Sequence, residues 1–246
     1  MKLLKKNIFG VDITDAFEKE ILEYIISTIK EDRKISIVTP NPEIVMYARK
    51  HPTFREIINR AEISLPDGIG LIWAGKILGK GLREKISGTD FILTLCKKAS
   101  EESLSIALLG ARQNVALKAS NRLKELFPNL NVVFVSSSDP TIDSVKELKG
   151  QSKPIDILFV AYGFPKQEEW IDRHLSKDPV RVAMAVGGAF DYISGEVIRA
   201  PKVIRVLGFE WLFRVFRQPW RAKRQLALVE FVCLVLKEKV ATSFRA

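Results

Sequence analysis

Short apolar runs rich in valine and isoleucine alternate along this chain with segments of helical period, and this alternation restricts the possible folds most. The runs predict six β-strands, at Ile35–Thr39, Ile63–Leu65, Ser105–Leu109, Val132–Val135, Ile157–Tyr162 and Val182–Val186. The segments between them predict helices at Pro42–Lys50, Gly70–Leu78, Asp90–Ala99, Asn114–Phe127 and Lys166–Leu175. Strands separated by helices are typical of a parallel sheet with crossover connections. We therefore expect an α/β fold in which helices flank a mostly parallel sheet.

The alternation stops beyond Gly195, which is our candidate domain boundary. Residues 1–195 are expected to form the α/β core, and residues 196–246 a basic, aromatic, helical C-terminal appendage. Of the formal net charge of +10, residues 199–246 carry +8, from eleven Lys or Arg against three Glu. Such a segment is expected to meet phosphate groups of a substrate, anionic lipid head groups or nucleic acid. A solvated basic face is the plainer interpretation, which the interleaved aromatic residues disfavour.

Apolar side chains accompany the arginines of this appendage. Several of them fit a helix face that enters the interfacial layer of a membrane: Trp211, Leu212, Val215, Phe216 and Trp220. The later apolar run Leu226–Leu236 has eleven residues, fewer than the ~20 that span a bilayer. We expect this run to lie on a membrane surface or to pack on a partner, which includes another copy of the chain in a homo-oligomer.

The cysteines and the first residues bear on the compartment. Cys96 and Cys233 lie far apart in apolar stretches, and the chain has no CxxC and only two histidines. A structural zinc site is therefore not expected, and two unpaired thiols suit a reducing compartment. The basic start Met1–Lys6 is followed by a stretch too short and too polar for the core of a signal peptide. We expect the protein to be cytoplasmic.

Ligands of open parallel sheets bind outside the carboxyl ends of the strands, so the residues after each predicted strand are candidates for a site. Thr39 and Asn41 follow the first strand in a Thr-Pro-Asn-Pro turn, where they either contact a ligand or cap the next helix. Asp67 follows the second strand in Leu-Pro-Asp-Gly-Ile-Gly, a turn that holds one carboxylate at the mouth of the sheet. Capping of the next helix is the alternative role of Asp67.

Glycines follow or end the later strands. Gly110 precedes a predicted helix, where backbone N–H groups can receive a phosphate. Gly187 and Gly188 allow close approach of a ligand, and Asp191 can accept hydrogen bonds from a base or a sugar. A turn built only for chain reversal is the alternative there. Gln167, near the start of the helix after the fifth strand, is expected to point toward the site. Neither GxGxxG nor GxxxxGK[ST] is present, so the glycines identify no dinucleotide or triphosphate loop.

Six motifs occur in one order along the chain. They are Thr39-Pro-Asn-Pro-Glu43, Leu65-Pro-Asp-Gly-Ile-Gly70, Phe164-Pro-Lys-Gln-Glu168, Val186-Gly-Gly-Ala-Phe-Asp191, Arg199-Ala-Pro201 and Gly208-Phe-Glu-Trp-Leu212. With them the chain resembles the WecG/TagA/CpsF glycosyltransferases, which build bacterial surface polysaccharides and teichoic-acid linkage units. The resemblance implies a Rossmann-like core, inverting transfer from a UDP-sugar, no metal or other cofactor, and an undecaprenyl-diphosphate-linked sugar as acceptor. Members known for N-acetylmannosamine transfer use an N-acetylglucosamine acceptor. It also implies a peripheral enzyme on the inner face of the bacterial cell membrane.

The resemblance also implies roles for particular residues. Asp67 matches the proposed catalytic base, and Thr39, Asn41 and Gln167 match pocket residues. Lys85 stands where similar relatives carry an arginine, so it keeps the charge but loses the bidentate fork for a phosphate. Three arginines match a pattern placed over the active site: Arg214, Arg221 and Arg224. The alternative for these arginines is contact with lipid phosphates only.

The chemistry expected of Asp67 follows from the reaction itself. A sugar hydroxyl that attacks an anomeric carbon loses its proton, and a carboxylate within hydrogen-bond reach accelerates that step by roughly 10²- to 10⁴-fold. The nucleoside diphosphate that leaves needs a metal, cationic side chains or helix N-termini to stabilise its charge. The chain has no Asp-x-Asp, which favours cations as stabilisers. A nucleotide-binding oxidoreductase and a nucleic-acid-binding protein remain the alternative functions, although we expect no nucleic-acid partner.

Overall fold

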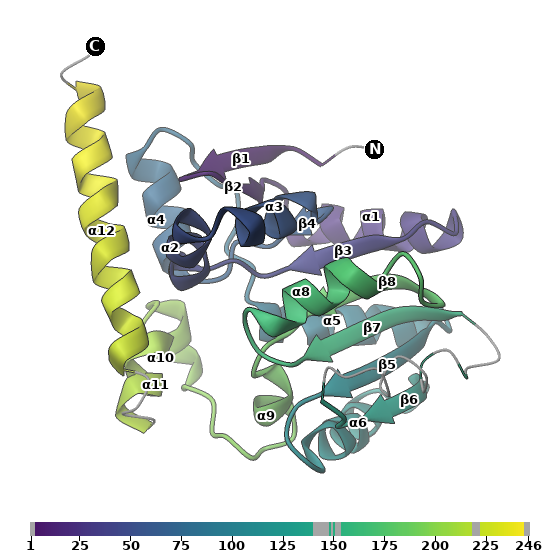
Figure 1. Ribbon diagram of the computed structural model, residues 1–246. Coiled ribbons are helices and arrows are strands. Elements are labelled where there is room, and N and C mark those ends of the chain that lie inside the picture. Colours follow the sequence, from purple (N-terminus) through teal and green to yellow (C-terminus); the bar gives the residue numbers. More distant parts are fainter. Residues whose placement is uncertain (1–2, 140–147, 149, 151–153, 218–221, 244–246) are drawn as a thin grey trace.

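Six parallel strands form the centre of the molecule in the computed structural model, which describes residues 3–139, 148, 150, 154–217 and 222–243 (Figure 1). Across the sheet the strand order is β4-β3-β8-β7-β5-β6. Chain order therefore differs from spatial order, with β3 and β8 as neighbours near one end of the sheet. This is the expected α/β architecture, a Rossmann-like fold with helices on both sides of a parallel sheet.

All six predicted strands and all five predicted helices are confirmed, with shifts of up to two residues at their ends. The strands are β3 (Ile35–Val38), β4 (Ile63–Ser64), β5 (Ser105–Gly110), β6 (Asn131–Ser136), β7 (Ile155–Ala161) and β8 (Val180–Ala185). The helices are α2 (Pro42–Lys50), α4 (Ile69–Ile77), α5 (Gly88–Glu101), α6 (Val115–Leu126) and α8 (Lys166–His174). The prolines at the first turn of α2 and just before α8 suit helix starts, because the first N–H groups of a helix need no intrahelical acceptor.

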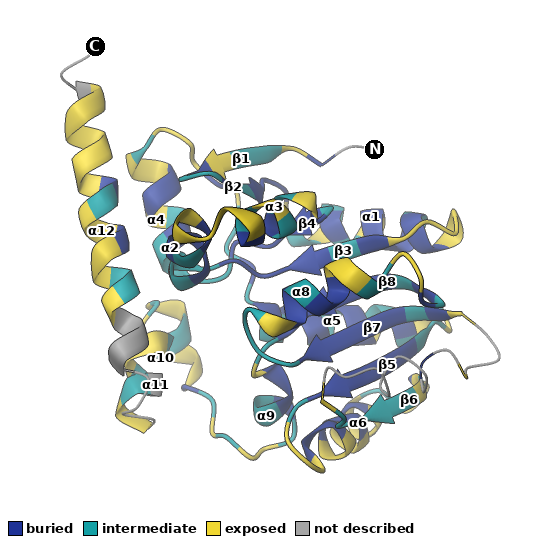
Figure 2. Cartoon of the chain, viewed as in Figure 1, coloured by how far each residue is buried: buried dark blue, intermediate teal, exposed yellow. Residues whose placement is uncertain are grey.

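The two faces of the sheet carry different sets of helices. Because successive side chains of a strand alternate between faces, Ile157 and Phe159 of β7 face one way and Leu158 and Val160 the other. The first face packs against α1 (Glu18–Lys30), α5, α6 and α9 (Ala189–Ile193). The second face packs against α8, through Trp170. Most residues of β3, β4, β5, β7 and β8 are buried, whereas the edge strand β6 is intermediate or exposed (Figure 2).

A further layer lies beyond the β4 edge of the sheet, and the sequence patterns indicated only its helices α2 and α4. An antiparallel hairpin of β1 (Lys5–Ile8) and β2 (Val11–Thr14) packs with α2, α3 (Pro52–Arg60) and α4 in a second core cluster. The end of the basic start, Lys5 and Lys6, and the beginning of the polar stretch that argued against a signal peptide together form strand β1.

The C-terminal appendage is helical, as expected. It consists of α10 (Lys202–Val206), α11 (Glu210–Arg217) and the long α12 (Ala222–Ser243). We expected Leu226–Leu236 to lie on a membrane surface or to pack on a partner. For one side of α12 this expectation was wrong, because that side packs on the core of the same chain. Phe231 and Val235 are buried in the second core cluster, because α12 runs along α2 and α4 (Figure 1).

The other side of α12 carries exposed apolar side chains: Leu226, Val229, Leu236 and Val240. Within the described ranges, every helix is too short or too polar to cross a membrane.

Candidate functional site

Asp67 lies in a turn that the backbone fixes. After β4, the N–H of Leu65 donates to the carbonyl of Val38 at 2.8 Å, and the N–H of Asp67 donates to the carbonyl of Pro40 at 3.0 Å. Gly68 follows with φ +91° and is the N-cap of α4. A positive φ favours glycine, so this residue lets the chain enter α4 directly after the carboxylate. Asp67 therefore precedes the cap position and lies at the positive end of the α4 dipole, which favours an anion there.

A cavity of about 390 Å³ opens beside Asp67. Residues of the core line one part of it, among them Asn41, Asp67, Trp73, Lys85 and Ser87. Residues of the appendage complete it, among them Arg205, Phe209, Glu210 and Trp211, with Leu228 and Val232 of α12. Parts of the chain more than 110 residues apart thus form one site, which we call the Asp67 cavity.

Asn41 and Thr39 lie next to Asp67 at the end of β3. Asn41 is the N-cap of α2, and its Oδ1 accepts a hydrogen bond from the N–H of Ile44 at 3.0 Å. The capping interpretation is therefore right for its oxygen, while the residue also lines the Asp67 cavity. Thr39 is buried beside Gly88, the first residue of α5. A Cβ added to Gly88 would lie 3.1 Å from Cγ2 of Thr39. Thr39 thus fixes how closely α5 approaches β3.

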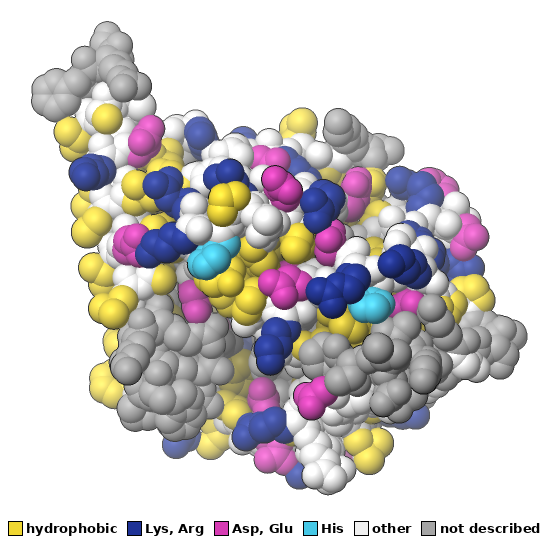
Figure 3. Space-filling view, in the orientation of Figure 1, with side chains coloured by type: hydrophobic (Ala, Val, Ile, Leu, Met, Phe, Trp, Pro, Cys, Tyr) yellow, Lys and Arg dark blue, Asp and Glu magenta, His cyan; other side chains and the backbone are white. Residues whose placement is uncertain are grey.

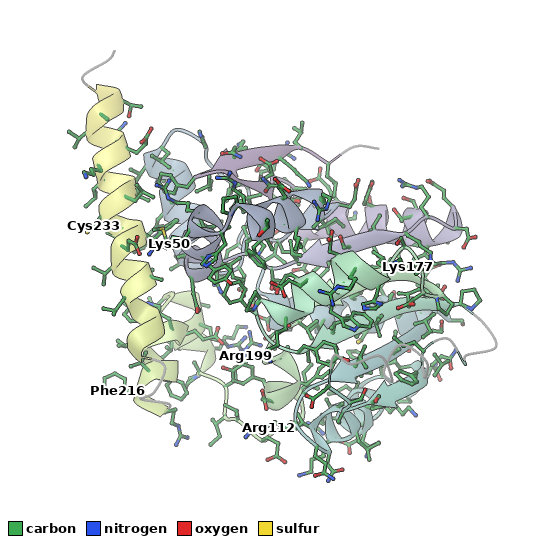
Figure 4. All side chains as sticks on the ribbon, viewed as in Figure 1. Lys50, Arg112, Lys177, Arg199, Phe216 and Cys233 are labelled. Carbon is green, nitrogen blue, oxygen red and sulfur yellow. The ribbon has the colours of Figure 1, made fainter. Side chains whose placement is uncertain are left out.

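An ion-pair cluster attaches the appendage to the first turn of α5. Arg199 donates to both oxygens of Asp90, at 2.6 and 2.8 Å, and also to Ser87 Oγ at 3.2 Å. Arg205 reaches the same carboxylate with Nη1, at 3.2 and 3.3 Å. Partial burial opposes ionisation of Asp90, but the hydrogen bonds and charges of the two arginines outweigh it and lower its pKa. The carboxylate is thus held ionised between two cations (Figure 4 labels Arg199).

Two further contacts fix the same segment against the Asp67 turn. Lys85 Nζ donates to the carbonyl of Arg205 at 3.2 Å. Gly208 has φ +82°, and an added Cβ there would lie 2.6 Å from Cγ2 of Ile69, the first residue of α4. Only glycine fits this contact without a shift, so the segment before α11 packs directly on the start of α4.

A second group of predicted residues lies at the ends of β5, β7 and β8. Gln167 is buried, and its Oε1 accepts a hydrogen bond from the N–H of Gly187 at 2.9 Å. Its Nε2 donates to Glu168 Oε1 at 2.8 Å. Gln167 therefore joins the first turn of α8 to the turn after β8, and its polar atoms are used inside the protein.

Glu168 is the least expected member of this second group. It is 1% exposed, and its Oε2 has no hydrogen-bond partner among the described residues. Burial raises the pKa of this carboxyl to about 7, although the hydrogen bond from Gln167 opposes the shift. A carboxyl of this kind can exist in its protonated form near neutral pH.

Gly110, Gly188 and Asp191 surround the same strand ends. Gly110 has φ +94°, and a Cβ would collide with Tyr162 Cδ1 at 2.8 Å, so β5 and β7 approach too closely there for any other residue. Asp191 accepts from Arg112 Nη2 at 3.3 Å, and its Oδ2 lies close to the backbone of Gly188 (Figure 4 labels Arg112). Asp191 and Arg112 thus place one acid and one exposed cation at this edge.

Of the three arginines predicted in the appendage, the structure describes the backbone of two. Arg214 belongs to α11 and Arg224 to α12, but their side chains lie outside what the structure describes, as does the whole of Arg221. The sequence patterns missed Arg205, Asp90 and Glu168. For the ion-pair cluster the Arg199-Ala-Pro201 motif was the available signal, but the motif did not show that Asp90 is the partner of Arg199.

Comparison with known proteins gives one consistent result. The model of the glycosyl transferase WecG/TagA/CpsF family matches residues 6–245. A Bacillus spizizenii protein named N-acetylglucosaminyldiphosphoundecaprenol N-acetyl-beta-D-mannosaminyltransferase is 32% identical over 241 residues, which cover 97% of this chain and 93% of that protein. Proteins of the same name are 33% identical in Bacillus subtilis, covering 85% of this chain and 82% of that protein, and in Staphylococcus aureus, covering 96% and 93%. These matches favour the glycosyltransferase interpretation over an oxidoreductase or a nucleic-acid-binding protein.

Proposed function

The chain belongs to the WecG/TagA/CpsF family of glycosyltransferases, and on this premise we propose that it transfers N-acetylmannosamine from a UDP-sugar to an N-acetylglucosaminyl-diphosphoundecaprenol acceptor. The names of the relatives support both the sugar and the acceptor. The observation that carries the proposal is the Asp67 cavity, in which three carboxylates, two cations and aromatic side chains converge. Teichoic acid or another surface polysaccharide is the proposed product pathway.

Asp67 is the proposed general base. The acceptor hydroxyl gives its proton to this carboxylate while its oxygen attacks the anomeric carbon, which inverts the configuration there and expels the nucleoside diphosphate. The hydrogen bond from Asp67 to Pro40 is made by the backbone, and the fixed turn holds the side chain at the mouth of the cavity. Such preorganised positioning is what a general base requires.

Cationic side chains are the proposed stabilisers of the leaving diphosphate, without a metal ion or another cofactor. Lys85 and Arg205 line the Asp67 cavity, and Lys85 Nζ has one described acceptor, which leaves further N–H donors for phosphate oxygens. Arg214, Arg221 and Arg224 are proposed to add to this charge. The nucleotide is proposed to lie at the neighbouring strand ends, against Gly110, Gly187, Gly188 and Asp191. Gln167 is proposed to support this position through its hydrogen bond with Gly187. Thr39 and Asn41 are proposed to lie beside the sugar.

The appendage is the proposed membrane contact of a peripheral protein on the inner face of the cell membrane. Figure 3 shows hydrophobic side chains along the outer edge of α12, and Figure 4 shows Phe216 at the outer side of α11. Phe216 is 76% exposed and Trp73 of α4 is 61% exposed. Large aromatic side chains prefer the interfacial depth of a bilayer, where a polyprenyl acceptor presents its head group.

A transfer assay with purified protein tests the proposal. The acceptor is a short-chain lipid-diphosphate N-acetylglucosamine, and a panel of UDP-sugars is offered with and without a chelator. We expect transfer of N-acetylmannosamine with inversion, unchanged by the chelator. Transfer of a different sugar would correct the donor, and loss of activity with the chelator would correct the metal-free mechanism.

A further inference from the structure

A second cavity, of about 520 Å³, lies between the end of α12 and the β1–β2 hairpin. Its walls come from the hairpin tip, the last turn of α2, the first turn of α3, the end of α4 and the last turns of α12. It is lined by Asn7, Phe9, Gly10, Arg49, Arg55, Leu78, Lys80, Glu238 and Thr242. Val232 lines the Asp67 cavity and Glu238 this one, so the two are about 9 Å apart along α12. We call it the hairpin cavity.

The lining of the hairpin cavity is strongly basic. Arg49, Arg55 and Lys80 contribute three positive charges, against one negative charge from Glu238. In the part of the chain that the structure describes, neither arginine forms an ion pair with an acidic side chain. Figure 3 shows several Lys and Arg side chains beside α12 in this region. Two guanidinium groups and an ammonium group around one hollow form a binding site for an anion.

Contacts with the β1–β2 hairpin hold the three basic side chains in place. The guanidinium carbon of Arg49 lies 5.7 Å from the centre of the Phe9 ring. Arg55 runs beneath Gly10, where an added Cβ would sit 3.2 Å from its Cδ, so the glycine makes room for the side chain. Lys80 Nζ donates to the carbonyl of Asn7 at 2.9 Å. Among the described residues neither guanidinium group has a hydrogen-bond acceptor, so the donors of both can serve a ligand.

Exposed apolar side chains lie near the hairpin cavity but do not line it. Ile77 of α4 is 37% exposed and precedes the lining residue Leu78, while Val240 is 55% exposed on the side of α12 opposite Glu238 and Thr242. Because that outward side of α12 is the proposed membrane contact, a phosphate carried by a lipid of the same bilayer keeps its apolar tail in the membrane while it reaches the cavity, which favours it over a free phosphate. We propose that the hairpin cavity binds the phosphate of an anionic phospholipid head group. This inference rests on the proposed membrane contact, and it adds a defined lipid site formed mainly by the core.

Vesicle binding tests this inference. The full chain is sedimented with vesicles of phosphatidylcholine alone or of an equal mixture with phosphatidylglycerol, at constant ionic strength. The double variant Arg49→Gln with Arg55→Gln removes two charges and keeps most of each stem. We expect its affinity for the mixed vesicles to fall by roughly thirtyfold or more, because each substitution removes a charge-assisted hydrogen bond to the bound phosphate in addition to a diffuse attraction. Binding to phosphatidylcholine alone should change little.

The matched control is Lys76→Gln with Lys237→Gln. These exposed lysines lie on α4 and α12, which both border the hairpin cavity, but they line neither cavity. We expect a fall of less than about threefold for this pair, because its charges act only through diffuse attraction. An equal loss in both double variants would overturn the inference, since it would show attraction by overall charge.

Two further measurements separate the remaining outcomes. Glycerol phosphate is added in a thermal-unfolding assay. If it stabilises the wild type but not the arginine variant, and both proteins bind vesicles equally, the ligand of the hairpin cavity is a free phosphate and the lipid assignment is overturned. Transfer to a water-soluble acceptor analogue is measured in parallel. It should be the same in wild type and arginine variant, and its absence in the wild type would overturn the proposed function instead.

Discussion

Arg199 donates one hydrogen bond to each oxygen of Asp90, and this pair fastens the beginning of the appendage to the first turn of α5. The residues concerned are 109 positions apart in the chain. Because the segment after Arg199 supplies Arg205, Phe209 and Trp211 to the Asp67 cavity, the pair determines where one wall of that cavity stands.

Asp90→Asn should loosen this wall. The amide keeps the shape but loses the charge that both arginines face, so we expect faster proteolysis between residues 199 and 217 and lower transfer activity. Limited proteolysis and kinetics measure both. Asp172→Asn is the matched control, since Asp172 forms a comparable two-bond pair with Arg60 away from the cavity, at 2.9 and 2.7 Å. Equal effects of the two variants would contradict a specific role for Asp90.

Asp67→Asn should lower kcat by roughly 10²- to 10⁴-fold, because the amide cannot accept the proton of the acceptor hydroxyl. Donor binding should persist, and UDP-sugar titration by calorimetry measures it separately from turnover. Glu43→Gln serves for comparison, as Glu43 is another acid that lines the cavity. Full turnover by the Asp67 variant with an intact fold would remove this residue from the base role.

Lys85→Gln and Arg205→Gln should each lower kcat/KM for the donor roughly tenfold or more, since a hydrogen bond to a charged group contributes about 1.5–3 kcal/mol. Steady-state kinetics with varied donor provides the measurement. Lys80→Gln is the control, because Lys80 lies a few residues before Lys85 in sequence but lines the hairpin cavity. Unchanged kinetics in both variants would place the diphosphate elsewhere.

Glu168 should make stability depend on pH. Its pKa of about 7 in the folded protein lies above the ~4.3 of an unfolded glutamate, so the folded state binds more protons between these values. The free energy of unfolding contributed by this group is therefore highest at low pH and falls as the pH rises from about 4.3 to about 7. Glu168→Gln should flatten that slope in urea unfolding from acidic to mildly alkaline pH. Glu169→Gln, the less buried neighbour, should keep it.

Phe231→Ala should lower the free energy of unfolding by about 3–5 kcal/mol, as removal of a buried aromatic ring does. Phe231 is 1% exposed and meets the edge of Phe9 with ring centres 5.7 Å apart. Val229→Ala on the opposite, exposed side of α12 should change it by no more than about 0.5 kcal/mol. Denaturant unfolding compares the two, and similar effects would mean that α12 is not part of the core.

The sheet was predictable because each buried strand carries a short apolar run, and the residues after those runs necessarily meet at one edge. Thr39, Asn41 and Asp67 were located in this way. The hairpin β1–β2 was not, because its Lys-Lys-Asn-Ile strand lacks an apolar run and gains burial only beneath α2 and α3. Arg205 was missed for a related reason. Its role depends on Asp90 and Lys85, and no local pattern shows which distant carboxylate a tail arginine will meet.

The two-sided character of α12 has a practical consequence for anyone who works with this enzyme. Cutting the chain before Ala222 to improve solubility would remove Phe231 and Val235 from the packing around Phe9, and with them part of what keeps α2 and α4 folded. Polar substitutions at the outward positions Leu226, Val229, Leu236 and Val240 avoid this damage. They would yield a full-length protein suited to crystallisation with soluble substrates, with the appendage wall of the Asp67 cavity still in place.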